Sequence, residues 1–108
     1  MTPLSFQTTL TGSVAVIALR GELDVAGAAL LENELNRISE DHDPQTVVFD
    51  LSSLEFMDST GLRALMNLDV RGREEGWALS LASPQAPVMR LLKLSGFEER
   101  VPIRDAPA

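Results

Sequence analysis

The spacing of apolar residues along the chain changes repeatedly between a period of two and a period of three to four. Residues 4–10 alternate between apolar and polar side chains, as in a half-buried strand, and residues 14–19 form an almost continuous β-branched and apolar run. The Thr-Gly-Ser sequence at 11–13 is a turn signal between them. We predict a hairpin that leads into a more buried strand, which closes at residues 21–24.

Residues 25–40 have the pattern of an amphipathic helix. The apolar side chains at spacings of three and four are Ala28, Leu31, Leu35 and Ile38. Asp24 stands immediately before this segment, where its carboxylate can cap the helix N-terminus. Residues 46–51 (TVVFDL) then give the strongest strand signal in the chain. Because they do not alternate, we predict a central strand that is covered on both faces.

A second helix is predicted to begin near Ser59 or Thr60 and to end at Gly76. Its predicted apolar stripe consists of Leu62, Leu65, Met66 and Val70. Arg63 belongs to the opposite, polar face of this helix.

The remaining segments complete an alternation of strands and helices. Residues 77–82 alternate as a strand, residues 86–94 predict a third helix that Gly96 ends, and residues 97–103 contain a short final strand. This order predicts an α/β fold. It has a mixed, largely parallel sheet of four to five strands, an N-terminal antiparallel hairpin strand at one edge, and three or four helices.

Composition narrows the classes of partner. The 108 residues fit one domain spanning 1–108, and 44% hydrophobic with 23% charged residues is ordinary for a globular protein. There is no apolar run of about 20 residues, no secretory signal and no cysteine, so we expect a cytoplasmic protein without a membrane partner. The net charge of −7 argues against direct binding to nucleic acid.

The residues offer little for catalysis. His42 is the single histidine and lies in an acidic loop, and no Gly-rich phosphate loop followed by Lys-Ser/Thr is present. We therefore expect no cofactor and no metal. One rival hypothesis is a metal-dependent nucleotide-binding enzyme that uses Asp24, Asp50 and Asp58, each of which we place at a strand end or a helix start.

Ser59 raises a separate question, because a hydroxyl between a strand and a helix can be a cap, a nucleophile or a phosphate acceptor. A helix N-terminus favours negative charge, so a phosphate on Ser59 would be partly accommodated by its own helix. We expect Gly61 to leave room for an approaching anion. The residues alone leave the cap and the phosphate acceptor open.

Four motifs in order carry a resemblance to a known family: LRGELD at 19–24, VVFDL at 47–51, FMDSTGL at 56–62 and VMRLLKLSGF at 88–97. Over residues 4–103 the chain resembles STAS domains, specifically the bacterial anti-sigma factor antagonists. The resemblance implies the STAS fold and a regulatory binding module rather than an enzyme.

The resemblance also implies partners and a switch. An anti-sigma factor that is a GHKL-type serine kinase would bind the dephosphorylated protein and phosphorylate Ser59, and a PP2C-type phosphatase would reverse this. The implied partner-binding residues are Asp24, Asp58, Ser59, Thr60, Gly61 and Arg63. The same fold also serves signalling scaffolds and lipid-transporting ABC systems, which are the alternative uses.

Two features depart from many relatives. Residues 25–28 (VAGA) lack the polar side chains common there, and the chain stops soon after Ile103, without a final helix. We expect the second feature to expose a face or an edge of the sheet and to favour a weak homodimer.

Overall fold

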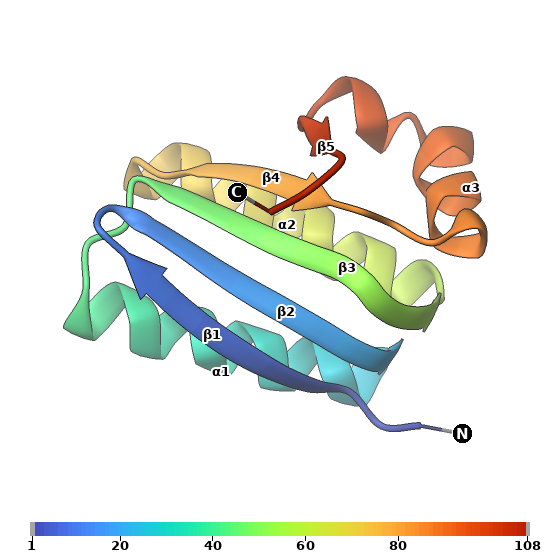
Figure 1. Ribbon diagram of the computed structural model, residues 1–108, viewed down its shortest axis with the longest axis horizontal. Coiled ribbons are helices and arrows are strands. Elements are labelled where there is room, and N and C mark those ends of the chain that lie inside the picture. Colours follow the sequence, from blue (N-terminus) through green and yellow to red (C-terminus); the bar gives the residue numbers. More distant parts are fainter. Residues whose placement is uncertain (1, 108) are drawn as a thin grey trace.

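The protein is described from a computed structural model, which covers residues 2–107. It has one five-stranded sheet in the order β1-β2-β3-β4-β5, in which β1 is antiparallel to β2 and the other neighbours are parallel (Figure 1). The strands are β1 Ser5–Thr11, β2 Val14–Leu23, β3 Thr46–Met57, β4 Ala78–Ala82 and β5 Ile103–Arg104. The predicted α/β class and the mixed sheet are confirmed.

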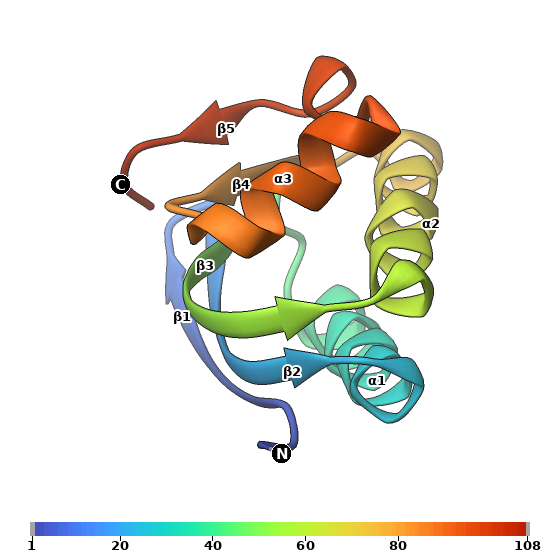
Figure 2. The same ribbon diagram turned by 90° about the vertical axis from the view of Figure 1, so that its right-hand side faces the viewer.

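Three α-helices and one 3₁₀ turn complete the fold. They are α1 Val25–Asp41, α2 Ser59–Glu75, α3 Ala86–Ser95 and η1 Phe97–Glu99. Figure 2 shows α1 and α2 side by side on one face of the sheet, whereas α3 lies beyond the end of β4 and packs beside β3. The other face of the sheet, toward the viewer in Figure 1, carries none of these three helices.

The core lies between the sheet and the α1–α2 layer. Neighbouring strands contribute aligned rows, because Ile17 pairs with Phe49 and Phe49 pairs with Leu81, and all three side chains have no exposed surface. Val47, Val48 and Phe49 are buried in succession, which confirms that the middle of β3 is covered on both faces. Strict alternation fails there because side chains on both faces of β3 are buried.

The predicted apolar stripe of α2 is partly wrong. Met66 and Val70 are 37% and 46% exposed. The buried face of the helix instead consists of Gly61, Leu62, Leu65, Leu68, Asp69 and Gly72. These residues recur at spacings of three and four along α2 and therefore share the face that covers the sheet. Met66 and Val70 lie at the margin of that face.

One strand runs further than predicted, and this difference shapes the end of the molecule where α1 and α2 begin. β3 continues to Met57, beyond the predicted residues 46–51, whereas β2 ends at Leu23, within its predicted closing residues. The register between the two strands shifts on either side of Arg20 and Gly21. Gly21 has φ +92°, and a Cβ there would lie 2.5 Å from the carbonyl oxygen of Pro3. Bulges bend strands. In Figure 2 the ends of β2 and β3 accordingly curve toward α1 and α2.

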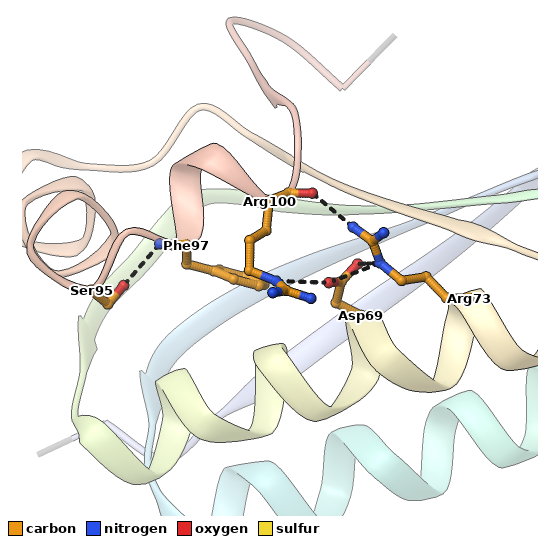
Figure 3. A network of polar contacts seen from close by, with 5 residues as sticks. All are labelled: Asp69, Arg73, Ser95, Phe97 and Arg100. Carbon is orange, nitrogen blue, oxygen red and sulfur yellow. Dashed lines mark hydrogen bonds and ion pairs between the residues drawn. The ribbon is translucent and has the colours of Figure 1, made fainter.

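A buried carboxylate connects α2 to the C-terminal segment (Figure 3). The side chain of Asp69 is 4% exposed and forms ion pairs with Arg73 at 3.2 Å and Arg100 at 3.7 Å. Arg73 also donates a hydrogen bond to the backbone oxygen of Arg100 at 3.0 Å. The network therefore holds the segment after η1 against the middle of α2, a contact between distant parts of the sequence that local pattern does not predict.

We expect Asp69→Ala to lower the free energy of unfolding by about 1–3 kcal/mol, because both arginines lose their shared acceptor. The effect stays in this range because the two arginine side chains are 58% and 55% exposed and keep their hydration. Urea denaturation measures it, with Glu74→Ala on the exposed face of α2 as the control. A loss below about 0.5 kcal/mol, the size of an ordinary surface substitution, would contradict the proposed role of the network.

Candidate functional site

The register between β2 and β3 brings two helix N-termini together. Leu23 pairs with Met57 in the parallel ladder, so Asp24 and Asp58, which follow them, leave the sheet from neighbouring positions. The backbone N–H of Asp58 donates to the carbonyl oxygen of Leu23 at 3.4 Å, which holds the two strand ends together. α1 and α2 therefore begin next to each other at the same edge, as Figure 2 shows.

The two aspartates have the same local role. Asp24 Oδ1 accepts a hydrogen bond from the backbone N–H of Gly27 at 3.0 Å, and Asp58 Oδ1 accepts one from Gly61 at 2.8 Å. Each carboxylate thus caps its helix and lies beside the partial positive charge of the helix N-terminus. The predicted cap at Asp24 is confirmed, and the cap of α2 is Asp58.

The interpretation of Ser59 as a helix cap is therefore wrong. Ser59 is the first residue of α2, its side chain is exposed, and within residues 2–107 its hydroxyl makes no hydrogen bond. Asp58 already supplies the capping oxygen, so the hydroxyl of Ser59 is left free to react or to bind a partner.

A Ser-His-Asp arrangement is also not formed. His42 follows the C-terminus of α1, whereas Ser59 lies beside the N-terminus of that helix. A 17-residue helix is about 25 Å long, so the single imidazole is far from the hydroxyl.

Gly61 has a different role from the one predicted. It is buried, and a Cβ at this position would lie 2.2 Å from the carbonyl oxygen of Leu23. The missing side chain lets the first turn of α2 approach the end of β2, and it does not open space for an anion. Gly61 faces inward toward β2, whereas Ser59 and Thr60 face solvent.

The three aspartates of the rival metal hypothesis do not converge. Asp50 lies in the middle of β3, where it pairs with Ala18 and Ala82, and its carboxylate accepts a hydrogen bond from the N–H of Ser52. Seven residues of strand lie between it and Asp58, a path of roughly 26 Å at about 3.3 Å per residue. Among residues 2–107 there is no group of three or more histidine and acidic side chains placed to hold a metal. The placement of Asp50 at a strand end was wrong because β3 is longer than its apolar run.

A groove of about 390 Å³ lies between α1 and α2, beside the capped ends. Its lining is Val25, Ala28, Ala29, Glu32, Thr60, Arg63, Ala64, Asn67, Leu68 and Arg71. We call it the α1–α2 groove. Small side chains on both helices leave its floor open and mostly apolar. The groove was not predicted from the sequence, although the small side chains of Ala28 and Ala29, which line it, were a usable signal.

The two arginines of the groove differ in their freedom. Arg71 is held by Glu75 at 2.7 Å and by the side-chain oxygen of Asn36, also at 2.7 Å. Arg63 is exposed, and among the described residues it forms no ion pair. Arg63 is therefore the cation at this site that is available to an incoming group.

Two exposed apolar side chains flank the capping aspartates. Val25, the first residue of α1, is 70% exposed, and Phe56, two residues before Asp58, is 48% exposed. Large apolar side chains at this exposure are candidates for contact with another protein. The structure thus gathers Asp24, Asp58, Ser59, Thr60 and Arg63 at one surface, with Gly61 beneath it.

Comparison with known proteins identifies the family. The STAS domain model matches residues 5–108. The chain belongs to the STAS domain family. The anti-sigma F factor antagonist of Paenibacillus polymyxa is 28% identical over 92 residues, which cover 85% of this chain and 79% of that protein.

Solved structures show the same fold. An anti-sigma factor antagonist from Mycobacterium paratuberculosis superposes with a TM-score of 0.82 at 25% identity, over 95% of this chain and 86% of that one. SpoIIAA, an anti-sigma factor antagonist, superposes in its unphosphorylated form with a TM-score of 0.79 at 22% identity, over 92% and 87% of the two chains. In its phosphorylated form the TM-score is 0.72 at 21% identity, over 92% and 90%. At these identities SpoIIAA supports the STAS fold alone. Within residues 2–107 no helix of this STAS domain has the length and apolarity to cross a membrane.

The roles assigned to the Asp-Ser-Thr-Gly turn are separable by substitution. We expect Gly61→Ala to cost at least about 2 kcal/mol of stability, because its Cβ would overlap the backbone of β2. Asp58→Ala should cost about 1 kcal/mol through the lost cap. Ser59→Ala should change stability by less than about 0.5 kcal/mol. Chemical denaturation of the three variants tests this order, and a larger loss for Ser59→Ala than for Asp58→Ala would restore Ser59 as the cap.

Proposed function

We propose that this STAS domain is an anti-sigma factor antagonist, which binds an anti-sigma factor and thereby frees a sigma factor for transcription. The observation that carries the proposal is the free, exposed hydroxyl of Ser59 at the N-terminus of α2, directly after the capping Asp58 and near the α1 cap Asp24. Family membership supports it, since the matching relatives are named as antagonists of this kind. On this proposal the domain acts by binding and is not an enzyme.

The contact surface combines charge with apolar area. The α1–α2 groove and the exposed side chains of Val25 and Phe56 offer sites for apolar groups of the anti-sigma factor. On this proposal Arg63 pairs with a carboxylate of that partner, and Asp24 and Asp58 accept hydrogen bonds from its cationic side chains. The apolar segment 25–28, which departs from many relatives, fits this proposal because two of its residues, Val25 and Ala28, line the groove.

Phosphorylation of Ser59 would switch the complex off. A phosphate adds about −1.5 to −2 charges beside Asp58 and Asp24. The helix N-terminus tolerates this charge in the free domain. A partner that closes over the site must instead desolvate it next to two carboxylates. A loss of about 2–4 kcal/mol of binding free energy would raise the dissociation constant of the complex roughly 30- to 1000-fold.

The finer identities of the enzymes follow from the resemblance. The anti-sigma factor itself would be a GHKL-type serine kinase that phosphorylates Ser59, and a PP2C-type phosphatase would remove the phosphate. Thr60 is also exposed but lines the α1–α2 groove, so we assign it to partner contact rather than to phosphate transfer.

Incubation with the candidate anti-sigma kinase and ATP should add one phosphate to the protein. Intact-mass spectrometry with peptide mapping is expected to locate it on Ser59. Ser59→Ala should abolish the modification, and Thr60→Ala should retain it. An active kinase that binds the protein but transfers no phosphate would disprove the switch and point to a constitutive partner, such as a signalling scaffold or an ABC transporter.

Binding of the same anti-sigma factor should depend on charge at the site. We expect Ser59→Asp to weaken binding at least tenfold and Arg63→Ala to weaken it about 5- to 30-fold, by calorimetry or surface plasmon resonance. Arg90→Ala removes an exposed arginine from α3 and is the matched control, with an expected change below threefold. Equal effects of the two arginine substitutions would place the interface elsewhere.

A further inference from the structure

The two edges of the sheet differ in how they are protected. β5 consists of only two residues, the second of which is Arg104, so that edge is short and charged. β1 is seven residues long, has no charge and no proline, and pairs with β2 without a break in register. The first charged side chain of the whole chain is Arg20. β1 therefore lacks the devices that usually prevent an edge strand from pairing with another chain.

The outer edge of β1 is also sterically open. β1 is the terminal strand of the sheet, and among residues 2–107 its only strand partner is β2 (Figure 1). α1 packs under β2. It reaches β1 through Glu34, which accepts a hydrogen bond from the Thr8 hydroxyl and is paired with Arg37 at 2.7 Å. The negative charge of Glu34 beneath the β1 edge is thus paired with the positive charge of Arg37.

We propose that two copies of this protein associate through antiparallel pairing of their β1 strands, with the two-fold axis at Thr8. Thr8 is the middle residue of β1, so this register aligns all seven residues of each strand. Phe6 then faces Leu10 of the second copy, Gln7 faces Thr9, Ser5 faces Thr11, and Thr8 faces its own equivalent.

The side chains fit this register on both faces. Phe6 and Leu10 pair within the chain with Leu19 and Ala15, which are fully buried, so both lie on the helix-covered face. Leu10 is 38% exposed, and Phe6 of the second copy would cover it. On the opposite face of the sheet, the Gln7 amide of one copy faces the Thr9 hydroxyl of the other, and Ser5 faces Thr11. Aromatic–aliphatic and threonine pairs are favourable across strands, and no like charges are opposed.

Other registers pair fewer residues of β1 and leave Phe6 or Leu10 without a partner. An axis at Gln7 or at Thr9 aligns only five residues of each strand. In the first case Leu10 stays uncovered, and in the second Phe6 loses its partner. An axis between two residues would place a side chain of one face opposite a side chain of the other, which the alternation of a strand does not allow. The length of β1 and its alternation of side chains therefore favour a two-fold axis at Thr8 over the other positions.

The dimer would be weak and separate from the Ser59 site. One pair of edge strands buries less area than a standard interface, and two chains of net charge −7 repel each other, so association should strengthen with salt. β3, whose end leads to Ser59, lies two strands away from the edge, so the α1–α2 groove stays open. The inference does not rest on the proposed function.

Sedimentation analysis of the full chain should show a mass that rises from 11.7 kDa toward twice this value with concentration. The midpoint is expected on the order of 0.1 mM and should fall as salt is added. Gln7→Lys with Thr9→Lys places lysines opposite lysines on the exposed face and should weaken association at least tenfold. Gln7→Glu with Thr9→Glu should do the same, and an equimolar mixture of the two variants should associate again.

The matched control carries the same two lysines away from the edge. Asn33→Lys with Gln45→Lys changes exposed residues of α1 and of the loop before β3, and it should associate at least as well as the unmodified chain. If this control weakens association as much as the edge variant does, the interface is not β1.

Disulfide trapping tests the register directly, because the chain has no cysteine. A mixture of Gln7→Cys and Thr9→Cys chains should cross-link under oxidised glutathione much faster than either variant alone. Faster cross-linking of one variant with itself would overturn the axis at Thr8. A monomer at 1 mM in high salt, with no cross-linking in any combination, would overturn the dimer and leave the β1 edge to a different protein.

Discussion

The parallel pairing of β2 with β3 is the constraint on which the site depends. This pairing, through Leu23 and Met57, sets the positions of the two aspartates that follow. Each aspartate caps a helix, so the same ladder fixes where α1 and α2 begin and which of their residues face solvent. A shift of this register by one residue would turn the side chains of β3 to the opposite face and separate the two caps.

Close approach of backbones makes this arrangement tight. Gly61 allows the first turn of α2 to contact Leu23, and Gly21 allows β2 to bend beside Pro3. Both glycines serve packing, and both lie near the end of β2. Because the packing is made by backbone and by the capping carboxylates, the Ser59 hydroxyl is not needed for the fold. A residue that the fold does not need is free to carry a reversible modification.

The surface around Ser59 and the β1 edge differ in their physical properties. The surface around Ser59 has two carboxylates, an exposed arginine without an ion pair among the described residues, and exposed apolar side chains. The β1 edge has no charged residue and offers backbone groups and a symmetric set of side chains. The Asp69 network holds the C-terminal segment against α2, on the helix-covered side of the sheet.

The sequence by itself determined the order of elements, the α/β class, the central position of residues 46–51 and the Asp24 cap. Each of these follows from local pattern, that is, periodicity, apolar runs and short-range hydrogen bonding. Tertiary structure decided the rest. β3 runs on to Met57 because pairing with β2 and not apolarity defines its length, and this removes Asp50 from the site. The inward direction of Gly61 and the burial of Asp69 depend on neighbours distant in sequence, which no local pattern reveals.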